Sequence, residues 1–104
     1  MIKHIENPRD YDGAVSEGRV LVDFWAPWCG PCRMLGPVLE EMDAAHGSEL
    51  QIVKVNVDEQ GELAARFNIR SIPTMILYEN GKIIGTKMGY VAKGPLLAWA
   101  LNSK

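Results

Sequence analysis

Val20-Leu21-Val22-Asp23-Phe24-Trp25 is followed directly by Ala26-Pro27-Trp28-Cys29-Gly30-Pro31-Cys32, and this stretch is the most informative part of the chain for predicting its fold. The first six residues are apolar except for one acid, which is typical of a central strand buried on both faces. After Cys32, apolar residues recur at helical spacing, at positions 34, 35, 38, 39 and 42. The two cysteines therefore lie where a buried strand gives way to a helix.

Helices and strands alternate along the rest of the chain. Asn7-Pro8 has the residue types of a helix N-cap and first turn, and Asn80-Gly81 is a strong hairpin signal. Pro37 should kink the helix after Cys32 or displace its start. The pattern predicts helices over residues 8–16, 62–67 and 96–101, and strands over residues 50–57, 74–78 and 82–87. This order indicates an α/β fold, with a central mixed β-sheet flanked by helices on both faces.

The composition is that of an ordinary globular domain. The chain has 104 residues, 47% of them hydrophobic, which suits a single domain over residues 1–104. Its formal net charge is -2 and its 11 Lys and Arg residues are scattered, so a nucleic-acid binder is not indicated. No apolar run is long enough for a membrane span, and the first residues lack the apolar core of a signal peptide. We therefore expect a monomer that stays in the cytoplasm.

Cys29 and Cys32 are the only cysteines, and three kinds of site use this spacing. A zinc site usually takes four Cys or His ligands, and only His4 and His46 are left to complete one. A structural disulfide is a second possibility, although closing so small a loop removes little entropy from the unfolded chain. The third is a redox pair, in which one thiolate attacks a substrate disulfide and its neighbour resolves the mixed disulfide.

The position of the pair favours the redox interpretation. A sulfur at a helix N-terminus faces free N–H groups and the positive end of the helix dipole, and both lower its pKa. Gly30 and Pro31 fit the first turn of that helix, where the missing N–H of proline costs nothing. Trp28 and Pro31 would shield the sulfurs while leaving the first one reachable. The sequence thus predicts a raised thiolate fraction at Cys29.

Trp25-Ala26-Pro27-Trp28-Cys29-Gly30-Pro31-Cys32 resembles the active-site segment of the thioredoxins, and the likeness covers nearly the whole chain, with a matching Ile72-Pro73-Thr74 downstream. The resemblance implies the thioredoxin fold and a general protein-disulfide reductase. It implies that Cys29 attacks, that Cys32 resolves, and that the Cys29–Cys32 disulfide is the redox group, with no bound cofactor or metal. Electrons would come from NADPH through a thioredoxin reductase. The other partners would be disulfide-containing proteins.

Asp23 is an acid within an apolar strand, so burial should raise its pKa. The residues alone leave open a partly exposed acid at a strand edge. By resemblance to thioredoxins, Asp23 lies beneath Cys32 and accepts the proton of that thiol, a role that a pKa near the working pH suits. Lys54 matches the lysine near this acid in the family, where its charge would oppose the rise in pKa. An ordinary solvated lysine is the alternative at that position.

The resemblance also implies a substrate-docking face. Pro73 matches a cis-proline that packs against the cysteines and leaves the backbone of Ile72 free to pair with a substrate strand. A trans proline at the start of an edge strand is the alternative. Gly89 matches a glycine whose lack of a side chain lets a substrate approach, while Tyr90 departs from the small residue that many relatives have. The face would consist of Trp28, Gly30, Pro31, Ile72, Pro73 and Gly89.

Two other functions remain open at the level of sequence. One is an oxidase or isomerase of the same fold, although Gly30-Pro31 is the dipeptide typical of thioredoxins. The other is a binding module whose apolar face docks on a partner regardless of redox state. The two roles, reduction and docking, can coexist in one protein.

Overall fold

The five strands of the computed structural model, which describes residues 1–104, form one mixed sheet in the order β1-β3-β2-β4-β5. Strands β1 and β2 run parallel to β3, whereas β4 runs antiparallel to both β2 and β5. The central position of β2 agrees with its apolar sequence, because its five interior residues are all buried. The strands span β1 Lys3–His4, β2 Arg19–Trp25, β3 Gln51–Asn56, β4 Thr74–Glu79 and β5 Lys82–Met88.

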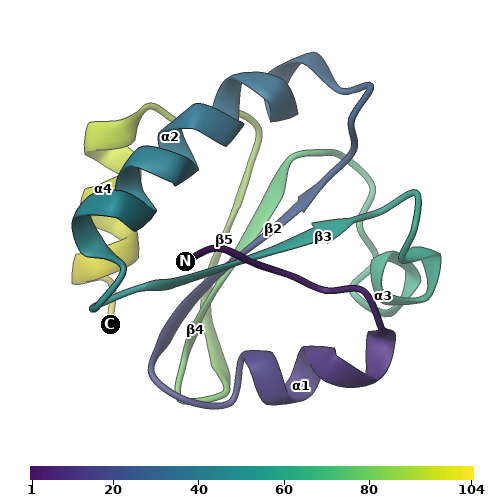
Figure 1. The fold of residues 1–104 in the computed structure, drawn as a ribbon, viewed down its shortest axis with the longest axis horizontal. Coiled ribbons are helices and arrows are strands. Elements are labelled where there is room, and N and C mark those ends of the chain that lie inside the picture. Colours follow the sequence, from purple (N-terminus) through teal and green to yellow (C-terminus); the bar gives the residue numbers. More distant parts are fainter.

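Helices cover both faces of this sheet (Figure 1). Helices α2 and α4 lie together on one face, and α1 and α3 lie on the other. No helix combines the length and the apolar character that crossing a membrane requires. The helical segments span η1 Pro8–Asp10, a 3-10 turn, α1 Tyr11–Ala14, α2 Gly30–His46, α3 Gly61–Arg66 and α4 Lys93–Asn102.

Alternation along β2 divides its side chains between two cores. Val22 and Phe24 join Tyr11 of α1 and Leu63 of α3 in one cluster of buried side chains. Leu21 points to the opposite face, where the cluster includes buried side chains of α2 and α4. Because both faces of the strand are packed, the path of β2 toward Cys29 is fixed from two sides.

The α/β fold with a mixed sheet and helices on both faces is confirmed. The hairpin at Asn80-Gly81 is also confirmed, with both residues at positive φ (49° and 85°), as a two-residue turn of this kind requires. The helix expected over residues 8–16 is shorter and begins as a 3-10 turn. Of the two effects expected of Pro37, displacement of the helix start was wrong, because α2 begins at Gly30 and contains Pro37 in its interior, whereas a kink stays a prediction. Strand β1 was not predicted, since two exposed residues carry no periodic signal.

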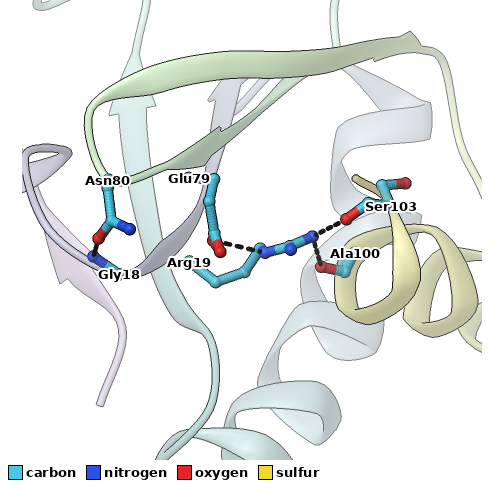
Figure 2. A network of polar contacts seen from close by, with 6 residues as sticks. All are labelled: Gly18, Arg19, Glu79, Asn80, Ala100 and Ser103. Atoms are coloured by element: carbon cyan, nitrogen blue, oxygen red, sulfur yellow. Dashed lines mark hydrogen bonds and ion pairs between the residues drawn. The ribbon is translucent and has the colours of Figure 1, made fainter.

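Arg19 ties the start of β2 to the end of α4 (Figure 2). Its Nε lies 3.0 Å from Oε2 of Glu79, and its Nη1 donates to the carbonyl oxygens of Ala100 and Ser103 at 3.2 and 2.7 Å. Carbonyls at a helix C-terminus lack partners within the helix and favour a nearby cation. Beside it, Asn80 Oδ1 accepts from the N–H of Gly18 at 2.8 Å. These contacts hold the end of the sheet opposite the cysteines.

Tyr11 and Tyr78 share a buried hydrogen bond of 2.8 Å between their hydroxyl groups, and Tyr11 is fully buried. Tyr78→Phe leaves the Tyr11 hydroxyl without this partner, so we expect a loss of about 1–3 kcal/mol in the free energy of unfolding. The double variant Tyr11→Phe with Tyr78→Phe should recover most of that loss, because neither hydroxyl remains. Urea unfolding of the wild type, both single variants and the double variant measures the cycle. A double variant less stable than Tyr78→Phe alone would contradict it.

Candidate active site

Cys29 and Cys32 form a disulfide at the junction of β2 and α2, with their Cα atoms 5.2 Å apart. Cys29 is the N-cap of α2, in extended backbone, and its Sγ accepts from the backbone N–H of Cys32 at 3.2 Å. The side chain of Cys29 thus takes the place that Ser or Asp occupies at other helix N-caps. Both residues are buried, at 5% and 3% exposure. The pair lies where the sequence predicted it.

The first turn of α2 supplies the electrostatic setting of Cys29. Gly30 and Pro31 are exposed and occupy the first two helical positions. The Sγ of Cys29 accepts a hydrogen bond from an N–H that has no partner within the helix. It also lies at the positive end of the dipole of this 17-residue helix. Both effects favour the thiolate over the thiol when the disulfide is reduced. A Cβ added at Gly30 would meet no atom within 4 Å, so the structure shows no packing reason for a glycine there.

The loop before β4 lies against the cysteines. The Ile72-Pro73 peptide bond is cis, and Sγ of Cys29 lies 3.6 Å from the carbonyl oxygen of Ile72. Gly89, directly after β5, donates its N–H to the carbonyl oxygen of Pro73 at 2.7 Å. Gly89 has φ 86°, a conformation that strongly favours glycine, and a Cβ added there would meet no atom within 4 Å. The structure therefore brings Ile72, Pro73 and Gly89 together at the cysteine pair.

Trp28 stands at the rim of the site with 66% of its surface exposed. Its indole Nε1 donates to Oδ2 of Asp58 at 2.8 Å, which fixes the ring beside the cysteines. A groove of about 290 Å³, called the Trp28 groove below, opens next to the ring between Trp28, Val57, Ile69 and Ile72. Asp58 was not predicted as a site residue. Its position after β3, parallel to β2, was the available signal, because the carboxyl ends of parallel strands meet at one edge.

Asp23 is 1% exposed, and neither of its carboxylate oxygens has a hydrogen-bond partner. Burial raises the pKa of Asp23 from 3.8 to about 7, while the positive charge of Lys54 acts to lower it. Side chains two apart on a strand share a face, so Asp23 faces the same side as Leu21, which packs in the cluster containing Leu35 of α2. Cys32 lies one turn before Leu35 on that helix, which puts the acid on the side of the sheet that carries the start of α2.

Lys54 lies beside Asp23 in the parallel register of β2 and β3. It is half-buried, and its Nζ lies 4.4 Å from the centroid of the Trp25 ring. Such a cation–π contact orients the ammonium group within the sheet rather than in bulk water. Lys54 is therefore neither fully buried beside Asp23 nor an ordinary solvated lysine.

No group of three or more His, Cys, Asp or Glu side chains comes together where it could hold a metal ion. His4 lies on β1 and His46 ends α2, at the far end of that helix from the cysteines. The zinc interpretation of the cysteine spacing therefore has no ligand set to support it.

Comparison with known proteins agrees with this geometry. The family model described as Thioredoxin matches residues 3–102. The thioredoxin of Bacillus subtilis is 47% identical over 88 residues, covering 85% of each chain, and that of Listeria monocytogenes is 46% identical over 96 residues, covering 92% of each. The crystal structure of Malassezia sympodialis thioredoxin (Mala s 13) superposes with a TM-score of 0.82 at 38% identity, over 94% of this chain and 86% of that one.

The resemblance drawn from Trp25 to Cys32 is thus confirmed, and so is the expected fold. A buried strand delivers a vicinal pair of cysteines to the N-terminus of a long helix, and the pair is joined as a disulfide. The chain belongs to the thioredoxin family and is a protein-disulfide oxidoreductase whose redox-active disulfide joins Cys29 and Cys32.

Proposed function

We propose that Cys29 is the attacking nucleophile of this disulfide reductase and that Cys32 is the resolving cysteine. The observation that carries this assignment is the N-cap position of Cys29, whose Sγ accepts the N–H of Cys32. That hydrogen bond and the helix dipole stabilise negative charge on the sulfur. Cys32 lies within the helix, where it is ready to attack the sulfur of Cys29 from one turn away.

The reaction is two successive thiol–disulfide exchanges. The thiolate of Cys29 attacks one sulfur of a substrate disulfide, forming a mixed disulfide and releasing the other substrate sulfur as a thiolate. The thiolate of Cys32 then attacks Sγ of Cys29, and the second substrate sulfur leaves. Two electrons have passed to the substrate, and the protein is left with the disulfide seen in this structure.

Asp23 is proposed to take the proton of Cys32 before the second step. Support comes from its burial, from its two unpartnered oxygens and from a pKa of about 7, near which a carboxylate can both accept and return a proton. Lys54 is a positioning residue in this proposal. Its charge holds the pKa of Asp23 lower than burial alone would set it, and the Trp25 ring orients it.

Substrate docking is proposed on the surface around the cysteines. Trp28 supplies a fixed aromatic face, and Ile72 with Pro73 supplies backbone that an extended substrate can pair with, as in β-augmentation. Gly89 keeps that approach open. Gly30 and Pro31 complete the exposed turn at the start of α2.

The remaining assignments extend those of the family. We propose thioredoxin reductase as the partner that returns electrons from NADPH to the disulfide, and disulfide-containing proteins as the substrates. A single domain over residues 1–104 is supported by the sheet, whose two cores include residues from near both ends of the chain, such as Ile5 and Ala100. The cytoplasmic location and the monomeric state stay predictions.

Reduction of insulin disulfides with dithiothreitol as electron donor tests the assignment of the two cysteines. Cys29→Ser and Cys32→Ser should both fall to the rate of dithiothreitol alone, because the complete cycle of two exchanges needs both sulfurs. When each variant is reduced, freed of dithiothreitol and then mixed with insulin, only Cys32→Ser should accumulate a mixed disulfide with a substrate chain, seen as a mass increase by mass spectrometry under non-reducing conditions. The two variants control for each other. An adduct on Cys29→Ser with none on Cys32→Ser would reverse the roles.

Asp23 should make the oxidised protein less stable as the pH rises. Its pKa is about 7 in the folded state and near 3.8 in the unfolded chain, so between these values the folded state binds more protons. The free energy of unfolding therefore falls by about 1.4 kcal/mol per pH unit in that range, in total about 4 kcal/mol, and is level above it. Asp23→Asn lacks this loss. Its free energy of unfolding, measured in urea, should therefore rise relative to that of the wild type from pH 4 to pH 7.

Asp12→Asn is the matched control for that measurement. Asp12 is exposed and paired with Arg66 at 2.7 Å, and this contact lowers its pKa. Its contribution to stability is present above its unfolded pKa and is lost as the pH falls, so the sign of the pH dependence is opposite. A constant difference between Asp23→Asn and the wild type across pH 4–8 would refute the assignment.

A further inference from the structure

Strand β5 presents two large apolar side chains that no other element covers. Ile83 is 53% exposed and Met88 is 69% exposed. In the antiparallel register Ile83 lies opposite Tyr78 and Met88 lies opposite Thr74, so both point to the face of the sheet that α1 and α3 cover elsewhere. The helices stop short of this edge strand, and exposed apolar surface gathered in one place marks a site of contact.

These side chains line a groove of about 320 Å³, called the β5 groove here. Its walls come from β4, β5 and the segment after α3. Its apolar lining consists of Phe67, Ile69, Ile76, Ile83 and Met88, and its one charged residue is Arg70.

The β5 groove adjoins the Trp28 groove beside the cysteines. Ile69 and Arg70 line both, so these two residues form a ridge between them. The ridge is held by the end of α3. Asn68 has φ 53°, and the N–H of Ile69 donates to the carbonyl oxygen of Ala64 at 2.9 Å, as in a Schellman cap.

Arg70 is the charge on this ridge. It is exposed, and its Nε donates to Oδ1 of Asn68 at 3.2 Å, which leaves both terminal nitrogens free of partners. No acidic side chain lines either groove. Arg66, nearby in sequence, is neutralised by Asp12. Arg70 therefore gives the ridge a local positive charge, which suits a carboxylate.

We propose that the β5 groove is a second substrate subsite, which takes an apolar side chain of the protein substrate while Arg70 binds an acidic side chain next to it. The subsite rests on the proposed function, since the occupant is a segment flanking the disulfide held at Cys29. It gives this reductase a preference among disulfides that the chemistry at the cysteines alone does not provide.

Second-order rate constants for reduction of defined peptides test the subsite. Each peptide carries one cysteine, capped as a mixed disulfide with 2-mercaptoethanol, and a Leu-Glu pair at graded distances on either side. Matched peptides carry Leu-Lys or Ala-Glu in place of that pair. The pre-reduced protein is the reductant, and each variant is judged by ratios between peptides, so differences in basal rate cancel.

The wild type should prefer Glu over Lys by about fivefold at the spacing that reaches Arg70, and this preference should shrink at high salt. Arg70→Glu should invert it. Arg9→Glu is the matched control, because Arg9 is also exposed and also donates its Nε to an asparagine two residues earlier, but lies in η1. It should keep the wild-type ratio.

The apolar half of the subsite is tested in the same way. The wild type should prefer Leu over Ala by about five- to tenfold, and both Ile83→Ser and Met88→Ser should bring this ratio toward one. The high exposure of Met88 guards against loss of folding in that variant.

Reduction of the neutral small molecule bis(2-hydroxyethyl) disulfide by the wild type distinguishes failure of the subsite from failure of the proposed reductase activity. If it proceeds while the peptide rates are independent of the flanking residues at every spacing, or unaltered in ratio by Arg70→Glu, the reductase stands and the subsite is overturned. If the wild type reduces neither the small disulfide nor any peptide, the proposed function fails and the subsite falls with it.

Discussion

Burial of β2 on both faces is the constraint on which the redox pair depends. The strand lies between two clusters of buried side chains, one shared with α1 and α3 and the other with α2 and α4. Its carboxyl end therefore cannot move without disturbing both cores. Because α2 begins a few residues later, Cys29 is held at the one place where a helix N-terminus can stabilise a thiolate. The chemistry of the pair follows from packing in the middle of the sheet.

The same strand carries a carboxyl group whose burial is energetically costly. Asp23 has no hydrogen-bond partner, and its carboxylate form is disfavoured by burial. An apolar residue in its place would pack against Leu21 and Met75 without that cost. The protein thus keeps an electrostatically unfavourable acid in its central, fully packed strand, an arrangement that suits a proton acceptor whose position must not vary. Lys54 limits the cost without removing it, since it sits beside the acid and is oriented by Trp25.

The two ends of the sheet differ in how much side-chain surface they leave exposed. At the end opposite the cysteines, Arg19 gathers the start of β2, the end of β4 and the last carbonyls of α4 into one network (Figure 2). At the cysteine end the side chains that lie near the pair are exposed or border grooves, as Trp28 and Ile72 do. A closed end and an open end suit a domain that must keep its fold while a large partner docks on one side. At the last residue of β5, next to Gly89, the uncovered side chain of Met88 extends that open side.

Local pattern was enough to predict the central strand, the long helix after it, the Asn80-Gly81 hairpin and the cysteine pair, because each is encoded by neighbouring residues. Burial of Asp23 could also be predicted, since its strand neighbours are apolar. Strand β1 could not, because its two exposed residues have no periodicity and pair only with β3. The position of Asp58 after β3 indicates only that it lies at the cysteine end of the sheet, and no neighbouring residue indicates that it binds Trp28, thirty positions earlier in the chain.

The sequence by itself thus determined which two sulfurs form the redox pair, and that the pair lies between a buried, acid-containing strand and the N-terminus of a helix. Only the tertiary structure decided what surrounds that chemistry. The strand order brought Asp58 to Trp28, the end of α3 set Ile69 and Arg70 between two grooves, and the reach of the helices left Ile83 and Met88 uncovered. The physical reason is that periodicity and capping act between neighbours along the chain, whereas these contacts depend on how distant segments pack around a shared core.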